Sequence, residues 1–126
     1  MADARKLVLV VDDDPAMRRL LTTILARDGS WTVDEAKTGA EAMEKVAAAR
    51  PAVIVLDMLL PDMSGLDLIE RLRGEGGPEP AVVAITAAAR SATPDAILHT
   101  ESSVREVLRK PVEPEQLLAA VRAACD

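Results

Sequence analysis

Aromatic side chains are nearly missing from this sequence of 126 residues, which has one tryptophan, Trp31, and neither phenylalanine nor tyrosine. Without aromatic platforms, nucleic-acid bases have nothing to stack on, and an aromatic-lined flavin pocket is not expected. The formal net charge of -6 also argues against non-specific binding of nucleic acid through phosphate contacts. The core must therefore be built from aliphatic side chains, methionine and alanine.

Cysteine is equally scarce, since Cys125 is the only one in the sequence. One cysteine cannot form an internal disulfide, which favours a cytoplasmic location. No apolar run is long enough to cross a bilayer, so no membrane contact is expected, and the polar residues 1–6 do not resemble a signal peptide. A chain of 126 residues can bury one core. We therefore expect a single domain over residues 1–126.

Short apolar runs alternate with longer segments of helical period along the whole chain. The runs cover residues 7–11, 31–36, 53–56, 81–85 and 104–108. This alternation is typical of repeated strand–helix units around a parallel sheet. The pattern predicts an α/β fold with five strands and five helices.

Local signals mark where the first two helices begin and end. Asp14 before Pro15 is a typical N-cap with proline at the first helical position, and Asp28-Gly29 is expected to end this helix. Thr38 and Glu41 have the spacing of a capping box, which predicts a second helix to about residue 50. The apolar face of the first helix is predicted from residues at spacings of three and four, namely Met17, Leu20, Leu21, Ile24 and Leu25.

The later helices have similar but weaker signals. The apolar residues between Leu66 and Leu72 predict a third helix, and Thr93-Pro94 could cap a fourth with a short apolar face. Pro114 is expected to begin the last helix, whose inward face is Leu117, Leu118, Val121 and Ala124.

Four of the apolar runs are followed, within two residues, by polar side chains suited to phosphate chemistry. These side chains are, in chain order, Asp12 and Asp13, Asp57, Thr86, and Lys110. In an open α/β sheet, ligands bind at the carboxyl ends of the strands. We therefore expect these side chains to converge at one edge of the sheet.

Carboxylates brought together in this way repel one another and raise each other's pKa values. A hard divalent cation removes the repulsion, and all-oxygen ligands favour Mg²⁺ or Mn²⁺ over Zn²⁺. With such an ion bound, a carboxylate can attack phosphorus as a nucleophile. Lys110 would supply a second positive charge, and Thr86 a hydroxyl donor to a phosphoryl oxygen.

These motifs, taken in order, resemble the receiver domain of bacterial two-component response regulators. The resemblance spans roughly residues 7–124 and implies a flavodoxin-like (βα)5 fold with strand order 2-1-3-4-5. The residues that carry it are Val10-Val11-Asp12-Asp13-Asp14-Pro15, Asp57-Met58 with Pro61 and Gly65, Thr86-Ala87, and Lys110-Pro111. A cis bond before Pro111 is also implied.

The resemblance implies a phosphoacceptor switch and not a conventional enzyme. Asp57 would take a phosphoryl group from a phosphohistidine on a histidine kinase or a histidine phosphotransfer protein. Mg²⁺ would be held by Asp12, Asp13, Asp57 and the backbone carbonyl of Leu59. Thr86 and Lys110 would contact the acyl phosphate and report it to the surface of the fourth helix, fifth strand and fifth helix. The signal would then pass to a downstream protein or to an output domain beyond residue 126.

The sequence departs from the family pattern in its last third. Val107 stands where the family usually has a tyrosine or phenylalanine that swings inward, and Ser103-Val104 replaces a usual Gly-Ala pair. The spacing from Thr86 to Lys110 is also slightly long. Leu59 and Ala88 occupy positions where family members often carry groups that position or exclude the hydrolytic water. Neither side chain can hydrogen-bond that water, which predicts slow self-hydrolysis of the acyl phosphate.

Two alternatives remain open from the sequence. Asp12-x-Asp14 resembles the nucleophile motif of haloacid-dehalogenase-like phosphatases, although no acidic pair follows Lys110 at a strand end as that family requires. The other alternative is a binding module that keeps the receiver fold and no longer switches, which Val107 suggests.

Overall fold

A five-stranded parallel sheet forms the centre of the protein, as seen in a computed structural model that describes residues 5–74, 79–87 and 103–125. The strands are β1 (Lys6–Val11), β2 (Trp31–Ala36), β3 (Val53–Asp57), β4 (Ala81–Thr86) and β5 (Val104–Arg109). Their order across the sheet is β2-β1-β3-β4-β5, and every neighbouring pair is parallel. The predicted flavodoxin-like fold and its strand order are confirmed.

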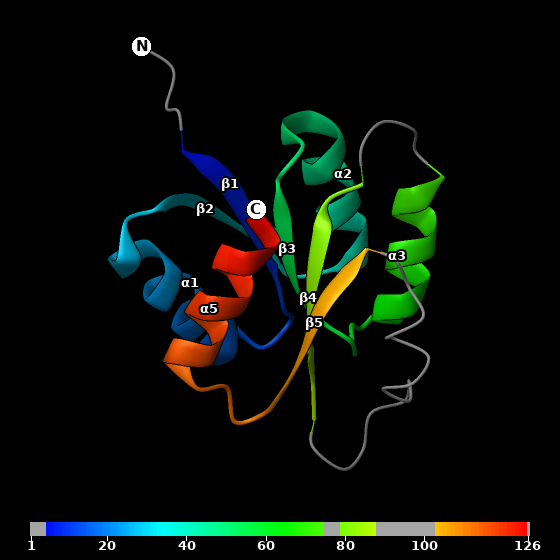
Figure 1. Ribbon diagram of the computed structural model, residues 1–126. Coiled ribbons are helices and arrows are strands. Elements are labelled where there is room, and N and C mark those ends of the chain that lie inside the picture. Colours follow the sequence, from blue (N-terminus) through cyan, green and yellow to red (C-terminus); the bar gives the residue numbers. More distant parts are fainter. Residues whose placement is uncertain (1–4, 75–78, 88–102, 126) are drawn as a thin grey trace.

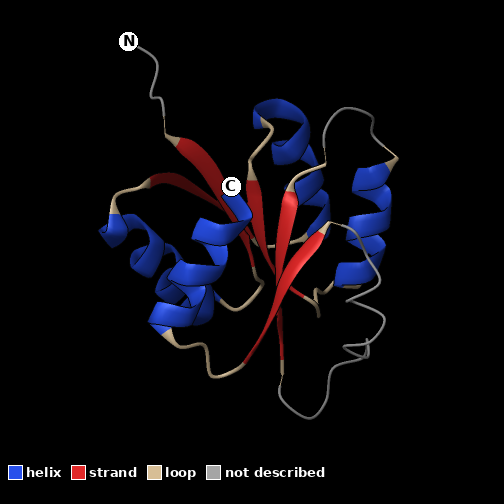
Figure 2. Cartoon of the chain, viewed as in Figure 1, coloured by secondary structure: helices blue, strands red, loops and turns tan. Residues whose placement is uncertain are grey.

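Helices cover both faces of this sheet (Figures 1 and 2). They are α1 (Pro15–Asp28), α2 (Gly39–Ala49), α3 (Gly65–Arg73) and α5 (Pro114–Cys125). The helices α1 and α5 lie on one face, and α2 and α3 lie on the other. The helix predicted from Thr93-Pro94 falls outside the described residues, as does Ala88. None of the described helices is long and apolar enough to cross a membrane.

The central strands are apolar at successive positions because both of their faces are covered. Val8 and Val10 of β1 contribute to the core under α1 and α5, whereas Leu9 contributes to the core under α2 and α3. Every residue of β3 and β4 is buried. The aliphatic composition therefore fills two cores, one on each side of the sheet.

The predicted caps are present where the sequence places them. The Asp14 carboxylate accepts a hydrogen bond of 3.0 Å from the backbone N–H of Ala16, and Gly29 ends α1 with a φ of 80°, which favours glycine. Thr38 Oγ1 accepts from the N–H of Glu41 at 3.1 Å. The reciprocal bond of the capping box differs from the prediction, because the Glu41 carboxylate accepts from the N–H of Lys37 and not from that of Thr38.

One residue of the predicted apolar face of α1 does not point inward. Leu20 is 46% exposed, whereas Leu21 and Leu25 are buried and Ile24 is partly buried. At 100° per residue, Leu20 lies at the margin of the stripe that these neighbours form, so the helix turns it toward solvent. Trp31, in contrast, packs in the core as its place at the start of β2 suggests, with 5% of its surface exposed.

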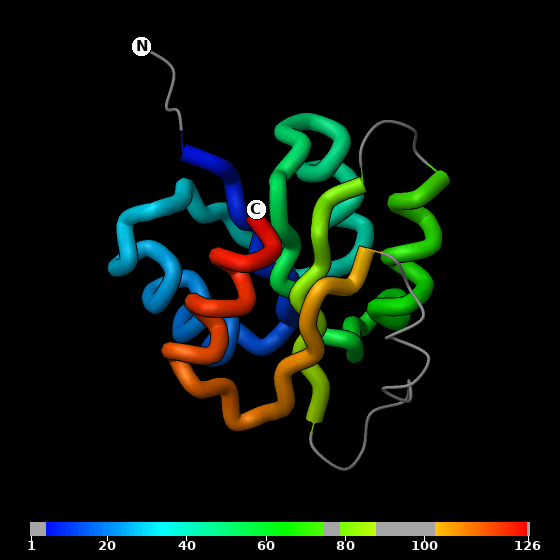
Figure 3. The backbone as a smooth tube through the Cα atoms, in the orientation of Figure 1, coloured from blue at the N-terminus to red at the C-terminus, as the bar shows by residue number. Residues whose placement is uncertain are grey.

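The course of the chain brings two strand ends together at the centre of the sheet (Figure 3). From the end of β1 the chain enters α1 on one face, and from the end of β3 it enters α3 on the other. Since β1 and β3 are direct neighbours, their connections diverge at a topological switch point. Such a point leaves an open crevice at the carboxyl ends of the strands, where ligands bind in this class of fold.

Candidate functional site

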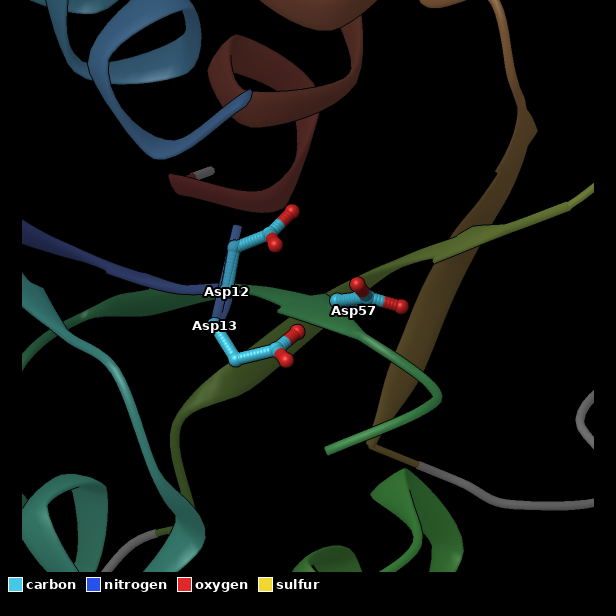
Figure 4. Close-up of side chains that lie close together, drawn as sticks. All are labelled: Asp12, Asp13 and Asp57. Carbon is cyan, nitrogen blue, oxygen red and sulfur yellow. The ribbon is translucent and has the colours of Figure 1, made fainter. Parts of the chain in front are cut away.

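Three carboxylates meet at this switch point (Figure 4). Asp12 and Asp13 directly follow β1, and Asp57 is the last residue of β3. Each offers a carboxylate oxygen that lies within 4.8 Å of one from each of the other two. Asp12 and Asp57 are buried, while Asp13 is exposed. The cluster is therefore closed on the side of the core and open on the side of Asp13.

Asp12 is the most deeply buried carboxylate of the cluster. Its side chain is fully buried, and only one of its oxygens, Oδ1, has a hydrogen-bond donor, the N–H of Asp14 at 2.9 Å. Oδ2 has no partner. The pKa of Asp12 is raised to about 6, first by burial and then by the neighbouring Asp57, while the hydrogen bond from Asp14 and the charge of Lys110 oppose the rise. A buried carboxylate oxygen without a donor is costly unless a cation or a proton satisfies it.

The donor set fits a small hard cation. All three side chains are carboxylates, and Mg²⁺ prefers oxygen ligands and keeps several of its water molecules when bound to protein. The unpartnered Oδ2 of Asp12 provides an inner ligand, and the exposed Asp13 leaves room for the retained water.

Asp57 is held by one donor on each of its oxygens. Oδ1 accepts from the backbone N–H of Leu59 at 3.0 Å, and Oδ2 lies 3.4 Å from Nζ of Lys110. Lys110 follows β5 directly, and its backbone N–H donates to the carbonyl of Thr86 at 2.9 Å. The Lys110–Pro111 bond is cis, as the resemblance implies. Lys110 therefore contacts Asp57 although β4 lies between β5 and β3 in the sheet.

Thr86 is the last residue of β4, the strand next to β3. Its side chain is 1% exposed, and its hydroxyl has no hydrogen-bond partner. Like the free oxygen of Asp12, this hydroxyl is a buried polar group at the carboxyl edge that lacks a partner. Such groups are uncommon in folded proteins and often mark a place where a ligand binds.

Asp14 takes no part in this acidic cluster. Its carboxylate caps α1 through Ala16, and the three-carboxylate group found among the described residues contains Asp12, Asp13 and Asp57. The phosphatase alternative needs Asp12 and Asp14 to act together. In the structure, the carboxylate of Asp12 lies close to those of Asp13 and Asp57 instead.

The edge strand β5 differs from the regular central strands. Val82 of β4 pairs with Val104, but Val83 pairs with Glu106, so Arg105 is an extra residue in a β-bulge. This bulge takes up one residue of the long segment between Thr86 and Lys110. Val107 is partly buried and packs against the core under α2 and α3.

Two side chains in the segments that follow Asp12 and Asp57 make contacts that no local signal in the sequence marks. Arg18 donates from its guanidinium to the backbone carbonyl of Asp12 at 2.8 Å, and its Nε lies 2.8 Å from the Glu35 carboxylate. Asp62 accepts hydrogen bonds from the backbone N–H groups of Gly39 and Ala40. In both cases at least one partner lies on another helix or strand. Periodicity and capping rules compare only neighbouring positions, so they cannot identify such a contact.

Comparison with known proteins finds one family that matches most of this chain. The family model of the response regulator receiver domain matches residues 8–122. The chain is 36% identical over 123 residues to the DNA-binding response regulator MtrA of Mycolicibacterium smegmatis. The aligned region covers 98% of this chain and 52% of that protein. The chain thus spans about half the length of the curated relatives it matches.

Solved structures of other proteins have the same fold as this chain. A response regulator receiver domain protein (CheY-like) from Methanospirillum hungatei matches with a TM-score of 0.84 and 27% identity, over 98% of this chain and 95% of that one. A sensor protein from Polaromonas matches with a TM-score of 0.85 and 31% identity, over 97% of each chain.

Proposed function

The chain belongs to the response regulator receiver domain family, and from this premise we propose that Asp57 is its phosphoacceptor. Receiver domains of response regulators act as phosphorylation-controlled switches in two-component systems. The role of Asp57 in that switch, and the roles of the residues around it, are our proposal. The observation that carries it is the position of the Asp57 carboxylate, within reach of the acid pair and 3.4 Å from Lys110.

We assign the metal site to the carboxylates of Asp12, Asp13 and Asp57 together with the backbone carbonyl of Leu59. The unpartnered oxygen of Asp12 supports this assignment, since it needs a cation or a proton. Mg²⁺, or Mn²⁺ in its place, would neutralise the charge of the incoming phosphoryl group.

Asp57 is suited to attack phosphorus because an ionised carboxylate needs no general base. One of its oxygens forms the new O–P bond while the N–P bond of the phosphohistidine breaks, and the electron pair of that bond returns to the imidazole nitrogen. Lys110 offsets the negative charge that Asp57 carries into the reaction. The free hydroxyl of Thr86 donates a hydrogen bond to a phosphoryl oxygen once that group is present.

The domain holds the phosphoryl group as a signal and does not turn over a substrate in the usual sense. Its phosphodonor would be a histidine kinase or a histidine phosphotransfer protein, which fits a cytoplasmic location. Relatives such as MtrA are about twice as long as this chain. The output would therefore pass either to a separate protein or to an additional domain.

Labelling with a small phosphodonor such as acetyl phosphate tests this function. We expect Mg²⁺-dependent incorporation of one phosphoryl group, and its loss in Asp57→Ala. Asp67→Asn is the matched control, because Asp67 is exposed in the first turn of α3 and lies outside the acid cluster. Undiminished labelling of Asp57→Ala would overturn the proposal.

A further inference from the structure

The loop that follows Asp57 is hydrogen-bonded to the start of α2 through the side chain of Asp62. Asp62 Oδ1 accepts from the N–H of Gly39 at 2.9 Å, and Oδ2 accepts from the N–H of Ala40 at 3.0 Å. These are the first two residues of α2, whose amides have no partner inside the helix. One carboxylate of the loop thus satisfies two amides of a helix that precedes it in the chain.

The helix α2 also has a cap of its own. Thr38 Oγ1 accepts from the N–H of Glu41 at 3.1 Å, which satisfies the third amide of the helix. Thr38 and Asp62 therefore cap different amides of the same helix end. Of these two caps, only Asp62 belongs to the loop beside Asp57 and so connects that loop to the helix.

The backbone of the helix and the side chains of the loop approach closely at this connection. A β-carbon at Gly39 would lie 2.5 Å from Sδ of Met63, so glycine leaves the space in which Met63 packs. The hydrogen bonds of Asp62 lower its pKa below the usual value, first through Gly39 and then through Ala40. The carboxylate is thus held in its ionised form against the positive end of the helix dipole.

The other end of the loop is attached to the phosphoacceptor. The N–H of Leu59 donates to Asp57 Oδ1 at 3.0 Å, and Leu59 pairs with Ser64 in an isolated antiparallel bridge. The N–H of Gly65 donates to the carbonyl of Met58 at 2.9 Å. The loop is therefore closed on itself at its base and anchored through Asp62 to a neighbouring element.

We propose that Asp62 is a positioning residue of the metal site: by holding the loop 58–64 against α2, it keeps the Leu59 carbonyl in place as a ligand. Asp62 is not part of the carboxylate cluster and so would act through the loop. The inference rests on the proposed function, which assigns the Leu59 carbonyl to the metal. It adds a residue, Asp62, and a link to α2 that this assignment does not contain.

Thermodynamic linkage makes the effect reciprocal. If anchoring by Asp62 favours metal binding, then metal binding must strengthen the anchor by the same free energy. Saturating Mg²⁺ should therefore slow hydrogen exchange at the amides of Gly39 and Ala40, the two donors to Asp62. The amide of Glu41, which donates to Thr38, is expected to change less.

The test compares Asp62→Ala with Thr38→Ala by Mg²⁺ titration and thermal unfolding. Both variants remove hydrogen bonds from the start of α2, so both are expected to lower the unfolding temperature. Only Asp62→Ala should weaken Mg²⁺ binding, by about tenfold, as loss of a residue that supports a metal ligand typically does. Asp62→Asn retains one acceptor oxygen and should fall between Asp62→Ala and the unsubstituted protein.

The outcomes separate this inference from the proposed function. Equal Mg²⁺ affinities for Asp62→Ala and the unsubstituted protein would overturn the positioning role alone. An equal loss of affinity in Thr38→Ala would also overturn it, because the effect would then reflect the stability of α2. Failure of the unsubstituted protein to bind Mg²⁺ would overturn the metal assignment and the inference with it.

Discussion

The central strand β3 and the edge strand β5 differ in burial and regularity, although both supply residues to the same site. Each position of β3, which ends in Asp57, is buried. In β5, which precedes Lys110, only Leu108 is buried, and Arg105 forms a bulge. The strand that carries Asp57 is thus packed along its whole length. The part that supplies Lys110 has fewer buried contacts and can shift at a lower cost in free energy.

This difference bears on how a signal would leave the site. The resemblance leads one to expect a large aromatic ring on the fifth strand, and the structure has the smaller, partly buried Val107 there. A valine moves less volume between its positions than a ring does. The acidic cluster around Asp57 therefore follows the family pattern more closely than β5 does.

The largest expected effect contrasts the two regions directly. Val55→Ala in β3 removes methyl groups from a site with no exposed surface, whereas Val107→Ala removes them from a partly buried edge strand. We expect Val55→Ala to lower the free energy of unfolding by about 2–3 kcal/mol and Val107→Ala by about 1 kcal/mol or less. Denaturant unfolding measures both. Equal losses would show that the edge is packed as firmly as the centre.

The next effect concerns pH and the buried Asp12. Its pKa is about 6 in the folded protein without metal and about 3.9 in an unfolded chain. Between these values the folded state binds more protons than the unfolded state, so stability falls as pH rises from about 4 to about 6. The loss should be about 2 kcal/mol, and it should then level off above pH 6.

Asp12→Asn serves as the control for this titration. The difference in unfolding free energy between the metal-free protein and the variant isolates Asp12 from the other carboxylates. We expect that difference to change across pH 4–6 and to be constant above it. A difference that is flat throughout this range would contradict the raised pKa.

The smallest expected effect concerns the lifetime of the phosphorylated form. Leu59 is 48% exposed beside Asp57, and its side chain cannot hydrogen-bond a water molecule. We expect Leu59→Asn to speed hydrolysis of the acyl phosphate by roughly tenfold, which corresponds to about 1.4 kcal/mol in the barrier. Loss of labelled protein with time measures the rate. An unchanged rate would show that this position does not control the hydrolytic water.

The failures of sequence-based prediction share one cause. The strands, the caps at Asp14 and Thr38, and the packing of Trp31 follow from local pattern and were predictable. The exposure of Leu20 and the bulge at Arg105 were not, because each depends on which neighbour packs against the residue. The anchor at Asp62 was also hidden, since its partners lie 22 and 23 residues away in the chain.

The sequence by itself determined the alternation of strands and helices and the residues that end each strand, because periodicity and capping act over a few neighbouring positions. It also placed the acid pair, Asp57 and Lys110 at strand ends. Only the tertiary structure decided that Asp12 and Asp57 are buried while Asp13 is exposed, and that burial leaves one oxygen of Asp12 without a donor. These properties arise from distances and solvent exclusion between segments far apart in the chain, which no local pattern encodes.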